Sequence, residues 1–119
     1  MMENDLFNNA EQKLEIEEKK EELKREREAM LREAVSKYQD AAMEGDPRAQ
    51  YALAHAYFQA QDYVTSLSWW NQAAKKGLTY AWTRVALQYA YGLGVDKDPA
   101  KAMDCLWNAI HGDPEDMNA

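Results

Sequence analysis

Ala41-Ala42-Met43-Glu44-Gly45 is followed 32 residues later by Ala73-Ala74-Lys75-Lys76-Gly77, and Ala109-Ile110-His111-Gly112 is a shortened third copy. The same spacing relates the residues after the first two glycines: Ala49, Leu53, Ala54 and Tyr57 correspond to Ala81, Val85, Ala86 and Tyr89. A period in the thirties is typical of stacked helical hairpins, in which each repeat packs only against its neighbours. The pattern predicts a short all-α solenoid, an architecture that usually offers a binding surface and not a reaction centre.

Helix start and stop signals divide the repeats into two helical hairpins. The first is predicted from helices over residues 47–59 and 63–76, and the second from helices over 79–91 and 99–111. Gly45 favours the left-handed turn that ends a helix, and Asp46-Pro47 supplies an N-cap and a first-turn proline for the next one. The turn at 92–98 is longer than the turn at 60–62, so the spacing of equivalent positions rises from 32 to 36 there.

The region before the hairpins is predicted to be a long charged helix. Residues 11–28 hold eight Glu and six Lys or Arg, without Gly or Pro, and these are strong helix formers. Ile16, Leu23 and Met30 are spaced by seven, as in a coiled coil, but charged residues occupy the other positions that would contact a partner helix. A solvated single helix is therefore favoured, and a weak dimeric coiled coil is the alternative.

The predicted domain organisation has four parts. Residues 1–10 are expected to be a disordered tail and residues 11–33 the charged helix. Residues 34–112 form the repeat domain, in which an apolar stripe through Ala34, Tyr38 and Ala42 packs as a half repeat. Residues 113–119 are expected to be a flexible tail.

Composition and charge exclude several classes of protein. The net charge of −7 and the lack of a Lys/Arg stripe disfavour nucleic-acid binding. No secretory signal pattern and no long apolar run is present, so no membrane association and a cytoplasmic location are expected. The single cysteine, Cys105, excludes an intrachain disulfide.

No residue pattern points to catalysis, a cofactor or a metal. Gly92-Leu93-Gly94 lacks the third glycine of a nucleotide-binding turn and follows a predicted helix. His55 and His111 lie in different repeats, and one cysteine cannot complete a zinc site. Cys105 is interpreted as an inert thiol on an apolar stripe. We therefore expect a protein that is not an enzyme and has no cofactor and no metal.

The repeats resemble the Sel1-like family, which is related to the tetratricopeptide repeats. The resemblance is carried by Ala49-Gln50, Leu53 and Tyr57, by the turn Gly92-Leu93-Gly94-Val95 with Asp98, and by Trp69-Trp70, Ala73-Ala74 and Gly77. It departs from the family pattern in the first repeat, which lacks the Gly-x-Gly-Val turn, and at Cys105-Leu106, where an aromatic pair is expected. The resemblance implies a TPR-like α-solenoid that works as an adaptor in complexes.

Helical periodicity separates a predicted core from a predicted binding face. Ala49, Leu53, Ala56 and Tyr57 should face the core, opposite Leu67, Trp69 and Ala73. Trp70 and Trp107 are expected to point away from their own hairpins. The remaining positions of the first helix in each hairpin should line a concave binding face: Arg48, Tyr51, His55, Gln59, Tyr80, Thr83, Arg84, Leu87 and Tyr91. The alternative is that these tyrosines are ordinary half-buried packing residues.

A second candidate surface lies on the last predicted helix. Trp107 shares one face with Met103, Leu106 and Ile110, and we expect a second copy of the chain or another partner to cover it. The leading functional hypothesis is a non-enzymatic adaptor that binds a protein or peptide. The alternatives are a dedicated inhibitor of the bacterial immunity or antitoxin type, whose acidity suits a basic partner, and a component that assembles as a homodimer through this face or the N-terminal helix.

Overall fold

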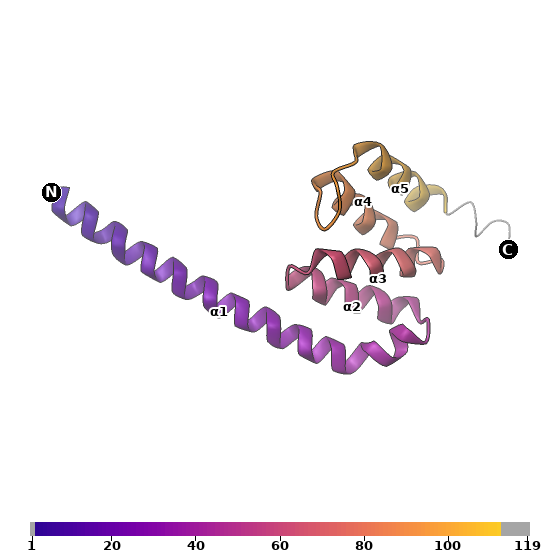
Figure 1. Ribbon diagram of the computed structural model, residues 1–119, viewed down its shortest axis with the longest axis horizontal. Coiled ribbons are helices and arrows are strands. Elements are labelled where there is room, and N and C mark those ends of the chain that lie inside the picture. The colour runs from indigo at the N-terminus through magenta and orange to yellow at the C-terminus, as the bar shows by residue number, and fades with distance from the viewer. Residues whose placement is uncertain (1, 113–119) are drawn as a thin grey trace.

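The computed structural model describes residues 2–112, with side chains described for residues 9–112. The expected flexible tail at 113–119 lies outside the described residues. Five helices make up the described chain, and no strand occurs among them: α1 Met2–Met43, α2 Pro47–Gln59, α3 Tyr63–Lys75, α4 Ala81–Tyr91 and α5 Pro99–His111. The fold is an all-α repeat solenoid with a long N-terminal helix, as the sequence predicts (Figure 1).

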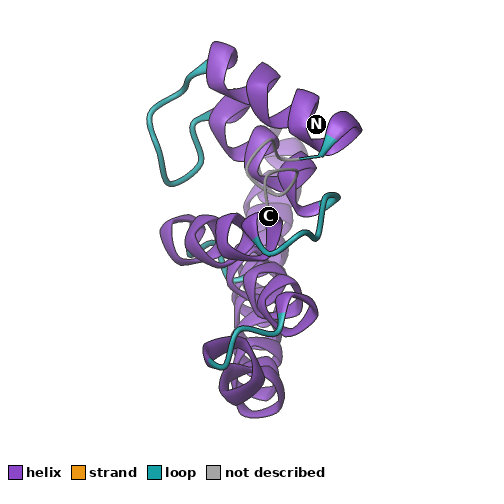
Figure 2. Cartoon of the chain, turned by 90° about the vertical axis from the view of Figure 1, so that its right-hand side faces the viewer, coloured by secondary structure: helices purple, strands orange, loops and turns teal. Residues whose placement is uncertain are grey.

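The helices stack in chain order, so that each packs mainly against the next one along the sequence. Figure 2 shows the helices layered one above another, with the loops at the ends of the layers. The N-terminal part of α1 projects beyond this stack (Figure 1). At 1.5 Å per residue a helix of this length reaches about 63 Å, and this accounts for most of the 70 Å long dimension of the molecule.

Equivalent turns in the two repeats have the same geometry. Gly45 and Gly77 both have φ of 101°, a left-handed conformation that costs glycine little. In the first turn the Asp46 N–H donates to the Ala41 carbonyl at 3.0 Å, and in the second the Leu78 N–H donates to the Ala73 carbonyl at 3.1 Å. These are the helix-closing bonds of a Schellman motif, so the sequence repeat is also a repeat of backbone conformation.

The core consists of two adjoining clusters. A small one between α1 and α2 contains Ala42, Ala49 and Leu53. A larger one joins α2 to α5 and contains Ala54, Trp70, Ala73, Ala74, Ala81, Trp82, Val85, Ala86, Ala102 and Cys105. The many alanines allow helices to approach closely, while the tryptophans fill the space between layers.

The predicted core positions are confirmed at Ala49, Leu53 and Ala73, which are buried. Ala56, Tyr57, Leu67 and Trp69 are half-buried. The prediction for Trp70 was wrong, because its side chain is only 1% exposed and packs against the rings of Tyr51 and Phe58 on α2. Helix α3 has neighbours on both sides, α2 and α4, so both of its faces are covered.

Two buried glutamines tie successive helices together. Gln50 on α2 donates to the Ala42 carbonyl at the end of α1 at 3.0 Å. Gln88 on α4 donates to the carbonyls of Tyr63 at 2.8 Å and Leu93 at 3.0 Å, which links α4 to the start of α3 and to the following loop. Gly94 packs against this start of α3, since a Cβ there would lie 2.6 Å from the Tyr63 carbonyl carbon. These contacts hold the hairpins in register.

The structure differs from the sequence expectation at the N-terminus. Helix α1 begins at Met2, so residues 2–10 continue the helix where a disordered tail is predicted. No glycine or proline lies before Gly45, and a helix that has nucleated in the charged segment extends through the preceding residues at low cost. At the other helix starts the boundaries agree within two residues.

Candidate binding groove between α1, α2 and α4

A groove of about 450 Å³ lies on one side of the stack, and we call it the concave groove. Helix α2 forms its floor, α1 one wall, and a single arginine of α4 the opposite wall. It is lined by Met30, Ala34, Tyr38, Tyr51, Ala52, His55, Ala56, Gln59 and Arg84. The alanines of α2 leave room above the floor, and the tyrosines and Met30 make most of the lining apolar.

A hydrogen-bonded cluster holds the α4 wall in place. The Arg84 Nε–H donates to the Tyr51 hydroxyl at 3.0 Å, and the guanidinium lies 5.9 Å from the Trp70 ring centroid. Tyr80 packs edge-on against Tyr51 with ring centroids 4.9 Å apart. Because only Nε takes part in a described hydrogen bond, the terminal guanidinium N–H groups remain available to an acceptor on a ligand.

The structure brings together four of the predicted binding residues, namely Tyr51, His55, Gln59 and Arg84. Tyr80 adjoins them through Tyr51. The other predicted residues do not line the groove: Arg48, Thr83, Leu87, Tyr91 and Trp107. Among these, Leu87 is half-buried, whereas Tyr91 at the end of α4 and Trp107 on α5 are exposed.

Three lining residues of α1 were not predicted as binding residues, since Ala34 and Tyr38 are assigned to packing and Met30 to a heptad spacing. Tyr38 does pack against the small core cluster, and it also reaches the groove. Ala52 was missed because a small residue carries no binding signal of its own. A search for positions flanking the core stripe of α2 would have found Ala52, whereas Ala56 was assigned to that stripe and also lines the groove.

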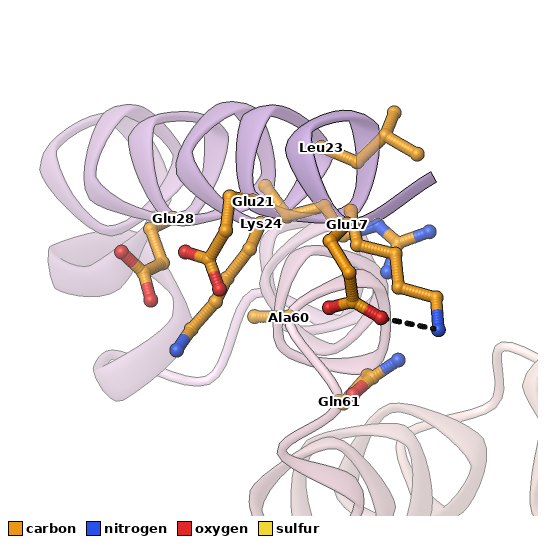
Figure 3. Close-up of a pocket in the computed structure, with 9 residues that line it drawn as sticks. Glu17, Glu21, Leu23, Lys24, Glu28, Ala60 and Gln61 are labelled. Atoms are coloured by element: carbon orange, nitrogen blue, oxygen red, sulfur yellow. Dashed lines mark ion pairs between the residues drawn. The ribbon is translucent and has the colours of Figure 1, made fainter. Parts of the chain in front are cut away.

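A second hollow of about 480 Å³ separates the charged part of α1 from the α2–α3 turn. Figure 3 shows Glu17, Glu21 and Lys24 on the side of α1 that faces Ala60 and Gln61, with Glu28 farther along the helix. Glu17 and Lys20 form an ion pair at 3.8 Å. The charges are mixed and solvent-exposed, so ion pairs here contribute at most about 1 kcal/mol each. The hollow offers a charged rim and no enclosed site.

The described side chains, at residues 9–112, form no cluster typical of a metal site. No cluster of three or more His, Cys, Asp or Glu side chains that could hold a metal ion occurs among the described residues. Burial raises the pKa of the Cys105 thiol above its ordinary value, and Lys101 opposes this only in part. A high pKa keeps the thiol protonated and unreactive. None of the described helices is long and apolar enough to cross a bilayer.

Comparison with known proteins gives one partial likeness. No protein-family model matches the chain. The ERAD-associated E3 ubiquitin-protein ligase component HRD3 of Candida glabrata is 36% identical over 65 residues, which is 55% of this chain. The aligned part is only 8% of that protein's length. The match is partial, and it agrees with the resemblance of this chain's repeats to the Sel1-like pattern.

Proposed function

We propose that this chain is a non-enzymatic interaction module, an adaptor or scaffold that binds a protein or peptide in the concave groove. The observation that carries the proposal is the groove itself, where apolar lining meets a fixed arginine and several tyrosines. Tyrosine and arginine are the side chains that most often anchor protein interfaces. A single cysteine also suits a reducing compartment such as the cytoplasm.

The groove predicts the chemistry of its ligand. Ala52 and Ala56 leave space above α2 that an apolar side chain would fill. Arg84 stands at the edge of that space with N–H groups available, so an acidic or carbonyl acceptor next to the apolar side chain would be bound well. We therefore propose a short segment that combines both features as the ligand.

A substitution that fills the groove tests this proposal. Peptides are selected from a random displayed library on the wild-type chain, and their dissociation constants are measured by titration. We expect values on the order of micromolar and a loss of at least about tenfold with Ala52→Arg, whose long side chain occupies the floor. The matched control is Ala100→Arg, at an exposed position of α5 outside the groove.

Both variants are compared with the wild type by circular dichroism, so that lost binding is separated from lost folding. Equal binding by Ala52→Arg and wild type would place the peptide site elsewhere. Failure to select any peptide would count against a peptide-binding groove.

A dedicated inhibitor is the second candidate, favoured by the net charge of −7. An acidic inhibitor attracts a basic target over long range, so its association rate falls steeply as salt is added. It would bind a folded protein far more tightly than a peptide and abolish that protein's activity. An adaptor would leave the activity of its partner intact.

A further inference from the structure

Helix α5 carries an uncovered apolar stripe. Met103, Leu106, Trp107 and Ile110 follow one another at the spacing i, i+3, i+4, i+7, which places them on one helix face. Their exposed fractions are 65%, 38%, 62% and 77%. The adjoining face is the one that packs into the fold, through buried Ala102 and Cys105. We call the four exposed residues the α5 stripe.

The repeat shows what an equivalent stripe does elsewhere in the molecule. With the spacing of 36, Met103, Leu106 and Ile110 correspond to Leu67, Trp70 and Ala74 of α3. Trp70 and Ala74 are fully buried in the cluster that includes Ala81 and Trp82 of α4. One repeat earlier, Val35, Tyr38 and Ala42 of α1 pack in the cluster that includes Ala49 and Leu53 of α2. A helix therefore covers both equivalent stripes.

The α5 stripe differs from the other two in a way that bears on its occupant. Ala42 and Ala74 are small and let a crossing helix approach closely, but the corresponding residue on α5 is Ile110. Gln39 and Asn71 place an amide beside the stripes of α1 and α3, whereas α5 has Trp107 there. The α5 stripe is bulkier and apolar throughout, and so it is less suited to a further repeat helix of the same type.

We propose that the α5 stripe of one chain packs against the α5 stripe of a second copy, with the two helices antiparallel. The stripe is symmetric about a point between Leu106 and Trp107. A two-fold axis there sets Met103 opposite Ile110 of the partner, and Leu106 opposite Trp107 of the partner. Large side chains then meet along the whole contact.

Charge and area both fit this pairing. The only formally charged residues of α5 are Lys101 and Asp104, so the helix is neutral and two copies do not repel along it. From the exposed fractions, the stripe offers roughly 500 Å² per copy, so the pair would bury about 1,000 Å², near the lower limit for a specific interface. The dimer is therefore expected to be weak and to dissociate at micromolar concentration.

The mass of the full-length chain in solution tests the proposal. Light scattering coupled to gel filtration should give 13.7 kDa at low concentration and a rise toward twice that mass at high concentration. Trp107→Arg places two cations near the axis and should leave the chain monomeric throughout. Tyr91→Arg is the matched control, at an exposed aromatic residue on α4, and should dimerise like the wild type.

Cysteine cross-linking in a Cys105→Ala background tests the antiparallel direction. Two Met103 positions lie about 10 Å apart along the axis in the antiparallel pair, so Met103→Cys should form no disulfide-linked dimer under mild oxidation. Met103→Cys combined with Ile110→Cys should form one. Cross-linking of Met103→Cys alone would overturn the antiparallel arrangement.

Two outcomes would overturn self-association through this stripe. One is a wild-type chain that stays at monomer mass up to millimolar concentration, and the other is a Trp107→Arg variant that still dimerises. Circular dichroism of each variant shows that it is folded. The Ala52→Arg variant should not alter the mass, so failure of the peptide-binding proposal and failure of this one are distinguishable.

Discussion

Leu53 lies between α1 and α2 with 1% of its surface exposed, and it joins α1 to the repeat stack. Its two buried neighbours in that cluster, Ala42 and Ala49, are alanines, which cannot expand to fill a gap. Arg84 has a different role, because it touches both Tyr51 of α2 and the ring of Trp70 of α3. Single side chains such as these connect adjacent helices, so removing one should destabilise the packing between the two helices that it joins.

Leu53→Ala should destabilise the chain by about 2–5 kcal/mol, because the buried alanines beside it, Ala42 and Ala49, are too small to close the cavity. The free energy of unfolding is measured by urea titration. Leu14→Ala is the control, since Leu14 is exposed on α1 and its truncation should cost less than about 0.5 kcal/mol. A loss below 0.5 kcal/mol for Leu53→Ala would place Leu53 outside the core.

Cys105 should react slowly with a thiol reagent while the chain is folded. Burial raises the pKa of its thiol above the ordinary value of 9.0, so little thiolate is present at pH 8, and the side chain is covered. We expect the reaction with an aromatic disulfide to be at least about 100-fold slower in buffer than in urea. Equal rates in the two conditions would contradict a buried thiol.

The raised pKa of the Cys105 thiol also makes the stability of the fold depend on pH. The folded chain binds the thiol proton more tightly than the unfolded chain does. The contribution of this proton to the free energy of unfolding is therefore fully present at pH 7. It should be lost as the pH rises above about 9, and urea titrations at pH 7 and pH 10 would show the decrease. A Cys105→Ala variant should lack this part of the dependence.

Helix α1 has two parts with different surroundings. Residues 9–26 are exposed, and Ile16 and Leu23 are about half exposed. From Met30 onward the helix lines the concave groove and packs on α2. The dimeric coiled coil stays an untested alternative.

Deletion of residues 1–26 should remove helical signal at 222 nm but change the unfolding free energy of the remainder by less than about 1 kcal/mol. The deleted residues contribute no buried side chain among those described, and isolated ion pairs such as Lys19–Glu22 are weak. Circular dichroism and urea titration measure the two quantities. A loss above about 2 kcal/mol would show that this part of α1 supports the stack.

The helices were predicted well because their ends are encoded locally. Asp46, Asp62 and Asp98 each accept a hydrogen bond from a nearby backbone N–H at a helix start, and such caps depend on a few adjacent residues. Trp70 was misplaced because it packs on Tyr51 and Phe58 of its own hairpin and also lies against Arg84 of the next hairpin. A helical periodicity indicates which residues share a face, but it does not indicate how many faces are covered.

The whole molecule has an uneven distribution of contacts, since α3 packs on both α2 and α4 while α5 packs mainly on α4. In a solenoid the stability of each layer depends on its neighbours. Amide hydrogen exchange at low protein concentration should therefore show α5 opening at a lower free energy than α3. Equal protection of the two helices would indicate that the stack unfolds as one cooperative unit.

The sequence alone determined the repeat, the four repeat helices and their caps, because these depend on spacing and on residues close together in the chain. Only the tertiary structure decided that Met30, Ala34 and Tyr38 form the groove wall opposite Arg84. It also decided that Trp70 is buried. Those outcomes depend on how α1 leaves the stack and on which helix lies over each face. The packing of one layer on another depends on many weak contacts between residues that lie far apart in the sequence. A local pattern of residues does not specify those contacts.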